Sequence, residues 1–183
     1  MRRAAAVLLI LLLATPAHAQ DALARLKSDL LSQGSATATL THWCADLKLA
    51  APPVIRARRD AVAAPASAET RALLAAGSGE AIGYRRVKLM CGDHVLSEAD
   101  NWYLPSRLTP EMNHTLDTSD TPFGVVVRPL NYSRTTLDAE PVADGPVALR
   151  VRALLKTAAG RPFSLVVENY SRALVAPQQA APQ

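Results

Sequence analysis

Two charged residues each lie on the apolar face of a segment whose sequence alternates like a β-strand. Arg85 shares a predicted strand face with Val87, Leu89 and Cys91, and Glu168 shares one with Val166 and Tyr170. A guanidinium can clamp a carboxylate through two parallel hydrogen bonds. A carboxylate on an apolar face is costly unless it is paired or functional. The two side chains are therefore candidates for a structural ion pair between neighbouring strands or for a site that binds an anion.

Several familiar catalytic motifs are missing from the sequence. It contains no G-x-S-x-G elbow, P-loop, G-x-G-x-x-G or H-E-x-x-H motif. His42, His94 and His114 are isolated from one another in sequence, which favours surface or capping roles over a catalytic base. The two cysteines form no C-x-x-C or Cys/His cluster, so we predict neither a metal site nor a cofactor.

The elements before residue 80 are predicted to be mainly helical. Leucines at helical spacing over 23–30 predict a helix that ends near Gly34, and a second helix is expected over 39–49. A strand over 54–62 follows two prolines, and a brief helix over 69–76 has Ser67 as its N-cap.

The rest of the chain is predicted to be mainly strands. A tight Gly92-Asp93 turn joins strands over 82–91 and 95–104, and a helix capped by Thr109 runs to about residue 116. After a polar loop over 118–122, a strand is expected from Phe123 to 137, then strands over 147–155 and 163–175. We therefore expect an α+β fold with about six mainly antiparallel strands and short helices on the N-terminal side. It forms a single domain over 20–175, followed by a disordered tail over 176–183.

A series of short motifs in the strand-rich half resembles the chorismate lyase family. The motifs are Tyr84-Arg85-Arg86-Val87, Asn101-Trp102-Tyr103-Leu104-Pro105, Thr121-Pro122-Phe123-Gly124, Arg134 and Val167-Glu168-Asn169-Tyr170. The resemblance covers residues 81–174. It implies the chorismate lyase-like fold, which is shared with ligand-binding domains of some bacterial transcription regulators.

The resemblance also implies roles for individual residues. The substrate-binding arginine of the family falls on Arg85 if the Arg-x-Val pattern decides, or on Arg86 if the distance to Pro105 decides; strand alternation favours Arg85. A backbone donor falls at Phe123-Gly124, where a glycine lets the main chain approach a ligand. Glu168 would be the general acid that protonates the leaving enol ether oxygen.

Two further positions bear on whether the protein is an enzyme. Arg134 is either a second anion contact or a solvated strand charge. Asn101 stands where the family's enzymes tend to carry a further arginine, which removes one cationic contact for a dianion.

The first nineteen residues are typical of a secretory signal peptide. Arg2 and Arg3 precede an apolar run over 7–13, and Ala17-His18-Ala19 is a small-x-small cleavage site. The apolar run is about half the length that a membrane-spanning helix needs. We therefore predict a bacterial periplasmic or secreted protein. In that oxidising compartment Cys44 and Cys91 most simply form one disulfide, the alternative being two buried free thiols.

Composition restricts the partners. Only 4% of residues are aromatic, which argues against base stacking on single-stranded nucleic acid. The formal net charge is +4, and removal of the leader takes away Arg2 and Arg3 and lowers it to +2. Nucleic acid is therefore not an expected partner, nor is a membrane once the leader has been removed.

Two main hypotheses of function follow. The first is a non-catalytic, exported domain that binds a small aromatic or unsaturated carboxylate, which export and Asn101 favour. The second is an enzyme of the chorismate lyase type that releases pyruvate and 4-hydroxybenzoate. A structural role with a protein partner remains as a third alternative.

Overall fold

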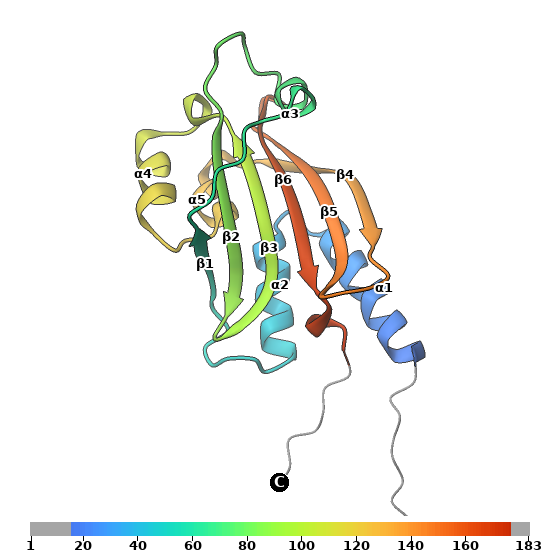
Figure 1. The fold of residues 1–183 in the computed structure, drawn as a ribbon. Coiled ribbons are helices and arrows are strands. Elements are labelled where there is room, and N and C mark those ends of the chain that lie inside the picture. Colours follow the sequence, from blue (N-terminus) through green and yellow to red (C-terminus); the bar gives the residue numbers. More distant parts are fainter. Residues whose placement is uncertain (1–15, 177–183) are drawn as a thin grey trace, which may run out of the picture.

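Six strands form one antiparallel sheet in the computed structural model, which describes residues 16–176 (Figure 1). The strand order is β1-β2-β3-β6-β5-β4, and every neighbouring pair is antiparallel. The strands are β1 (Ile55–Asp60), β2 (Gly83–Cys91), β3 (His94–Tyr103), β4 (Ser133–Pro141), β5 (Val147–Lys156) and β6 (Pro162–Ser171). The predicted α+β class is confirmed.

Helices α1 (Pro16–Ser32) and α2 (Ala36–Asp46) lie against one face of this sheet, behind it in Figure 1. Helices α4 (Pro110–Thr118) and α5 (Phe123–Val126) lie beside the β1 edge, and α3 (Ala68–Leu73) lies at one end. Three short 3-10 helices, η1 (Pro105–Arg107), η2 (Arg128–Leu130) and η3 (Arg172–Leu174), complete the fold. The predicted caps are present: Ser67 Oγ accepts from the Thr70 amide, and Thr109 Oγ1 from the Met112 amide.

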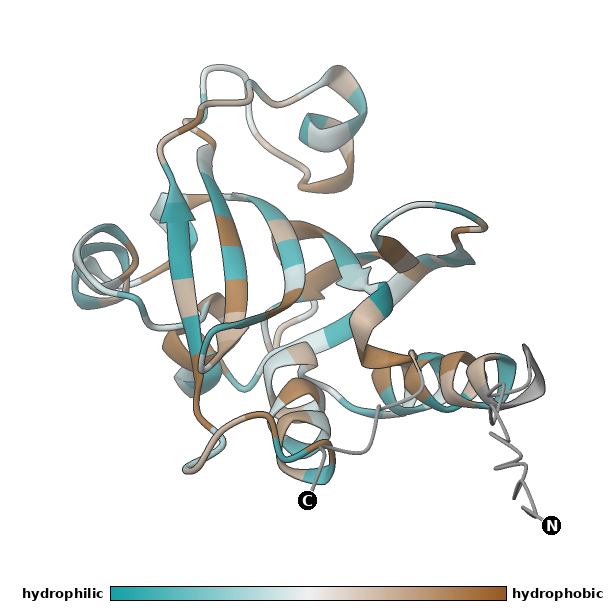
Figure 2. Ribbon diagram, turned by 60° about the horizontal axis from the view of Figure 1, so that its bottom comes forward, coloured by the Kyte–Doolittle hydropathy of each residue, from teal (hydrophilic) through white to brown (hydrophobic). Residues whose placement is uncertain are grey.

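The two faces of the sheet differ in polarity, as the alternation of hydropathy along the strands shows (Figure 2). The inner face packs against α1 and α2 in one core whose members include Leu26, Leu40, Trp43, Val87 and Tyr170. Over most of its area the outer face carries charged side chains, because the odd and even positions of a strand point to opposite faces. The inner face therefore contains the residues that burial constrains, and any charge on it needs an explanation.

A disulfide ties α2 to the sheet. Cys44 in α2 is bonded to Cys91 at the end of β2, with their Cα atoms 6.2 Å apart. Both residues are completely buried in the inner core. The predicted pairing is confirmed, so α2 cannot move far from β2 while the bond is intact.

The strand expected from Phe123 onward is wrong in its first part. Residues Phe123–Val126 form the one-turn helix α5, η2 follows, and β4 begins only at Ser133. The valines over 125–127 favour a strand locally. Burial of the Phe123 ring against Tyr103 and Phe163 instead holds the segment in a helical turn, an effect of tertiary contacts.

The predicted leader and tail fall largely outside the described part of the chain. The apolar run over 7–13 and residues 177–183 lie outside it, whereas Pro16 begins α1. Among residues 16–176 no helix is both long and apolar enough to cross a membrane.

Candidate functional site

A cavity of about 40 Å³ lies between the inner face of the sheet and the first turns of α2 and α5. Apolar side chains form much of its wall, and its polar lining comes from Ser35, Thr37, Asn101, Tyr132, Arg134 and Glu168. A single buried water needs a cavity of roughly 10–15 Å³. The cavity is therefore large enough for a few waters or one small polar group.

An ion pair forms the charged wall of this cavity. Arg134 Nη2 on β4 lies 2.7 Å from Glu168 Oε2 on β6, and their side chains are only 5% and 8% exposed. Tyr170 donates its hydroxyl hydrogen to the same Oε2 at 2.9 Å. Burial opposes the charge on Arg134, but the Glu168 carboxylate and the nearby phenols outweigh it, so the pKa of Arg134 is raised. Arg134 is thus not the solvated charge that the sequence allowed for.

Arg134 and Glu168 each have an atom that could form a further hydrogen bond. Nε of Arg134 is buried without a partner, whereas Nη2 donates to Glu168. Both hydrogen bonds to Glu168 reach Oε2 and leave Oε1 unengaged by the described residues. In this arrangement Glu168 is an acceptor in both contacts and donates in neither.

Arg85 lies on the inner face, as strand alternation predicted, and is 2% exposed. It donates to the carbonyl oxygens of Ser119 at 3.1 Å and Thr121 at 3.2 Å, while its Nε has no partner. Burial, followed by the nearby charge of Arg59, lowers the pKa of Arg85 to about 10. Arg85 contacts the loop before α5 and does not itself line the cavity. The ion pair between Arg85 and Glu168 considered from the sequence does not form, because Glu168 is paired with Arg134.

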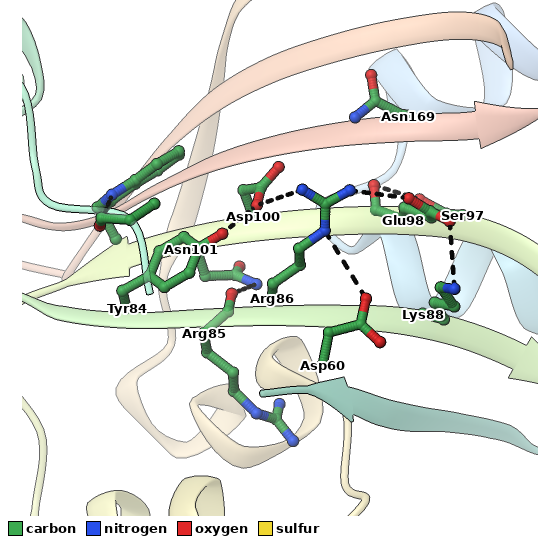
Figure 3. A network of polar contacts seen from close by, with 12 residues as sticks. Asp60, Tyr84, Arg85, Arg86, Lys88, Ser97, Glu98, Asp100, Asn101 and Asn169 are labelled. Atoms are coloured by element: carbon green, nitrogen blue, oxygen red, sulfur yellow. Dashed lines mark hydrogen bonds and ion pairs between the residues drawn. The ribbon is translucent and has the colours of Figure 1, made fainter. Parts of the chain in front are cut away.

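Arg86 points to the opposite face of the sheet (Figure 3). Its guanidinium lies 3.0 Å from Glu98, 3.7 Å from Asp100 and 3.8 Å from Asp60. The ligand contact that the sequence left open for Arg86 is therefore incompatible with this cavity. The one-residue offset between Arg85 and Arg86 decides the matter, since it reverses the face of a strand residue.

Phe123 and Gly124 line the cavity from α5, as the resemblance implied for a ligand-contacting turn. A Cβ added at Gly124 would lie 3.1 Å from the Tyr132 hydroxyl and 3.5 Å from Ser35 Oγ. The glycine is thus needed for the close approach of α5 to these two side chains.

Sequence reasoning missed several polar residues of the cavity. Asn101 appeared only as a departure from the family pattern, yet it lines the cavity and donates to the Arg85 carbonyl oxygen at 3.4 Å. Ser35 is the N-cap of α2, and its Oγ accepts a hydrogen bond from the Ala38 amide; a serine before a helix is a pattern that could have pointed to it. Nothing local in the sequence places Ser35 or Tyr132 beside Glu168, because three different elements contribute them.

Groups of three or more His, Cys, Asp or Glu side chains with the spacing of a metal site do not occur in the described part of the chain. The polar groups that line the cavity are the ion pair, the hydroxyls of Ser35, Thr37 and Tyr132, and the amide of Asn101.

Comparison with solved structures identifies the fold. The effector domain of PhnF from Mycobacterium smegmatis matches with a TM-score of 0.54 and 12% identity, covering 75% of this chain and 88% of that one. PhnF itself matches with a TM-score of 0.52 and 14% identity, covering 77% of this chain and 65% of that one. At these identities the likeness shows the fold alone, and the fold is the chorismate lyase-like one of regulator effector domains.

Sequence comparison finds a much nearer relative. No model of a known protein family matches the chain. The uncharacterized protein y4mC from Sinorhizobium fredii (strain NBRC 101917 / NGR234) is 42% identical to it, over 86% of this chain and 78% of that protein. The chain therefore belongs to the family of y4mC.

Proposed function

We propose that this protein is an exported, non-catalytic domain that binds a small carboxylate in the cavity between the sheet, α2 and α5. One observation carries the proposal: the buried guanidinium of Arg134 lines this cavity, and its Nε has no hydrogen-bond partner. Unused donors on a buried cation are costly, and an anionic group that enters the cavity would satisfy them.

The charges on the inner face support an anionic ligand. Arg85 and Arg134 both have buried side chains there, and within residues 16–176 the only buried carboxylate is that of Glu168. The carbonyl oxygens that hold Arg85 carry no formal charge. Among the described residues the inner face thus has one more buried cation than buried anions, which favours an anionic ligand over a cationic one.

The contacts of Glu168 support binding over catalysis. A general acid must present a proton to its substrate. Glu168 instead accepts hydrogen bonds from Arg134 and Tyr170 at the same oxygen. Fold likeness to the PhnF effector domain agrees with a binding role, although a shared fold does not assign function.

Isothermal titration calorimetry of the full chain recovered after export tests the binding proposal. The probes are propionate, benzoate, 4-hydroxybenzoate and chorismate. We expect at least one of them to bind with one-to-one stoichiometry, and we expect Arg134→Gln to weaken that binding at least tenfold. Arg86→Gln, on the opposite face, is the matched control and should leave the binding unchanged. If none of the probes binds, or if Arg134→Gln has no effect, the proposal is wrong.

Chorismate also distinguishes the alternative function. Release of pyruvate and 4-hydroxybenzoate, lost in Glu168→Gln, would show an enzyme of the chorismate lyase type and overturn the non-catalytic proposal. Export is tested separately by expression in a Gram-negative host and intact mass of the periplasmic fraction. We expect a chain that begins at Gln20; recovery only from the cytoplasm with residues 1–19 attached would overturn the export proposal.

A further inference from the structure

The cavity wall contains an acceptor as well as donors, and this limits the ligand beyond its being a carboxylate. Glu168 Oε1 is not engaged by any described residue, and Oε2 is occupied by Arg134 and Tyr170. Oε1 is not fully buried, and Glu168 lines the cavity, so this oxygen faces the open space of the cavity. A plain carboxylate placed beside Arg134 would face this oxygen with no hydrogen to donate.

We propose that the ligand is a carboxylate with a hydroxyl or ammonium group on the neighbouring carbon. The inference rests on the proposed binding function and deepens it. The carboxylate faces the guanidinium of Arg134, and the hydroxyl or ammonium donates to Glu168 Oε1. The ligand's two groups lie on neighbouring atoms, and the guanidinium and carboxylate that would receive them are neighbours in one ion pair.

Charge balance supports a ligand that donates as well as accepts. The Arg134–Glu168 pair is neutral as a unit, so a carboxylate gains from Arg134 but is repelled by Glu168. A donor on the ligand turns that second interaction into a charge-assisted hydrogen bond. The glutamate then selects against carboxylates that lack the donor, because they would leave Oε1 desolvated and unpaired.

The size of the cavity limits which part of the ligand it encloses. A space of about 40 Å³ admits a two- or three-carbon polar head and excludes an aromatic ring. Ser35 and Thr37 line both this cavity and an open groove of about 750 Å³ beside α2. A longer ligand would place its head in the cavity and its remainder in this groove, whose volume is that of an ordinary small-molecule site.

Matched pairs of acids test the inference on the unaltered full chain. The three-carbon set is propionate, lactate and alanine, and the aromatic set is phenylacetate, mandelate and phenylalanine, with both enantiomers of each chiral acid. We expect a hydroxy or amino acid to bind at least tenfold more tightly than its unsubstituted partner, about 1.4 kcal/mol at 25 °C. Hydroxy and amino acids are compared separately to show which donor the glutamate prefers.

Variants then assign the effect to the glutamate. In Glu168→Gln we expect propionate to bind more tightly, because the repelling charge is gone, and the preference for lactate to fall below threefold. Amino acids should lose more than hydroxy acids, since their ammonium loses a charged acceptor. Arg86→Gln should change neither preference.

Two outcomes would overturn the inference. If propionate and lactate bind equally and Arg134→Gln abolishes both, the binding function stands and the selection by Glu168 is wrong. If no carboxylate of either set or of the earlier panel binds, the binding function itself fails. The measurements on the unaltered chain decide the question even if Glu168→Gln does not fold.

Discussion

The buried pair between Arg134 and Glu168 predicts a large and strongly coupled effect on stability. Glu168→Leu would leave the Arg134 guanidinium, whose side chain is 5% exposed, without its counter-charge and would also remove the acceptor of the Tyr170 hydroxyl. Loss of one member of a buried pair costs about 3–5 kcal/mol. Domains of this size unfold with about 5–15 kcal/mol, so the variant would lose about a fifth of its stability or more.

The double variant Arg134→Met/Glu168→Leu separates the pair from the bulk of its side chains. With both charges gone, neither partner leaves an uncompensated charge behind, and the double variant should be more stable than either single variant. The predicted interaction energy in the double-mutant cycle is about 3 kcal/mol or more, well above the value for exposed pairs. Only the orphaned Tyr170 hydroxyl keeps the double variant about 1–3 kcal/mol below the unaltered protein.

Urea unfolding followed by the fluorescence of Trp43 and Trp102 measures these free energies. Tyr170→Phe serves as the control for the hydroxyl alone and should cost about 1 kcal/mol. Single variants that cost less than 1 kcal/mol, or a double variant whose loss equals the sum of the single ones, would refute the reasoning. Either result would mean that the pair is as well solvated as one on the surface.

The remaining predictions concern other elements. Replacing Cys44 and Cys91 by serine should lower the free energy of unfolding by about 4 kcal/mol for a 47-residue separation in the chain-entropy model, measured by urea unfolding against the oxidised protein. Thr109→Ala removes the cap of α4 and should cost about 1 kcal/mol in the same assay; no change would show that the cap is replaced by water. Burial and the hydrogen bond to Asp100 raise the pKa of Tyr84 to about 12. The ionisation of Tyr84 should therefore appear near that pH in the absorbance difference between the unaltered protein and Tyr84→Phe. In Asp100→Asn the same ionisation should appear at a lower pH. Because the folded pKa exceeds the unfolded value of about 10, the contribution of Tyr84 to stability is complete below pH 10 and is lost as the pH rises through 12.

Local sequence determined most of the elements of this protein. Alternation put Arg85 and Glu168 on the inner face of their strands, and the cap residues Ser67 and Thr109 marked the starts of two helices. The disulfide followed from the cysteine count and the predicted export, and the structure pairs Cys44 with Cys91. These features depend on residues near one another in sequence or on composition, which is why the sequence alone is sufficient for them.

Only the tertiary structure decided the composition of the candidate site. Arg134 and Glu168 are 34 residues apart and come together because β5 lies between β4 and β6 in the sheet, so the two side chains meet across one strand on the inner face. The helical turn at Phe123 likewise depends on rings from β3 and β6. Strand pairing and long-range burial outweigh local preference at these positions, and neither can be read from neighbouring residues.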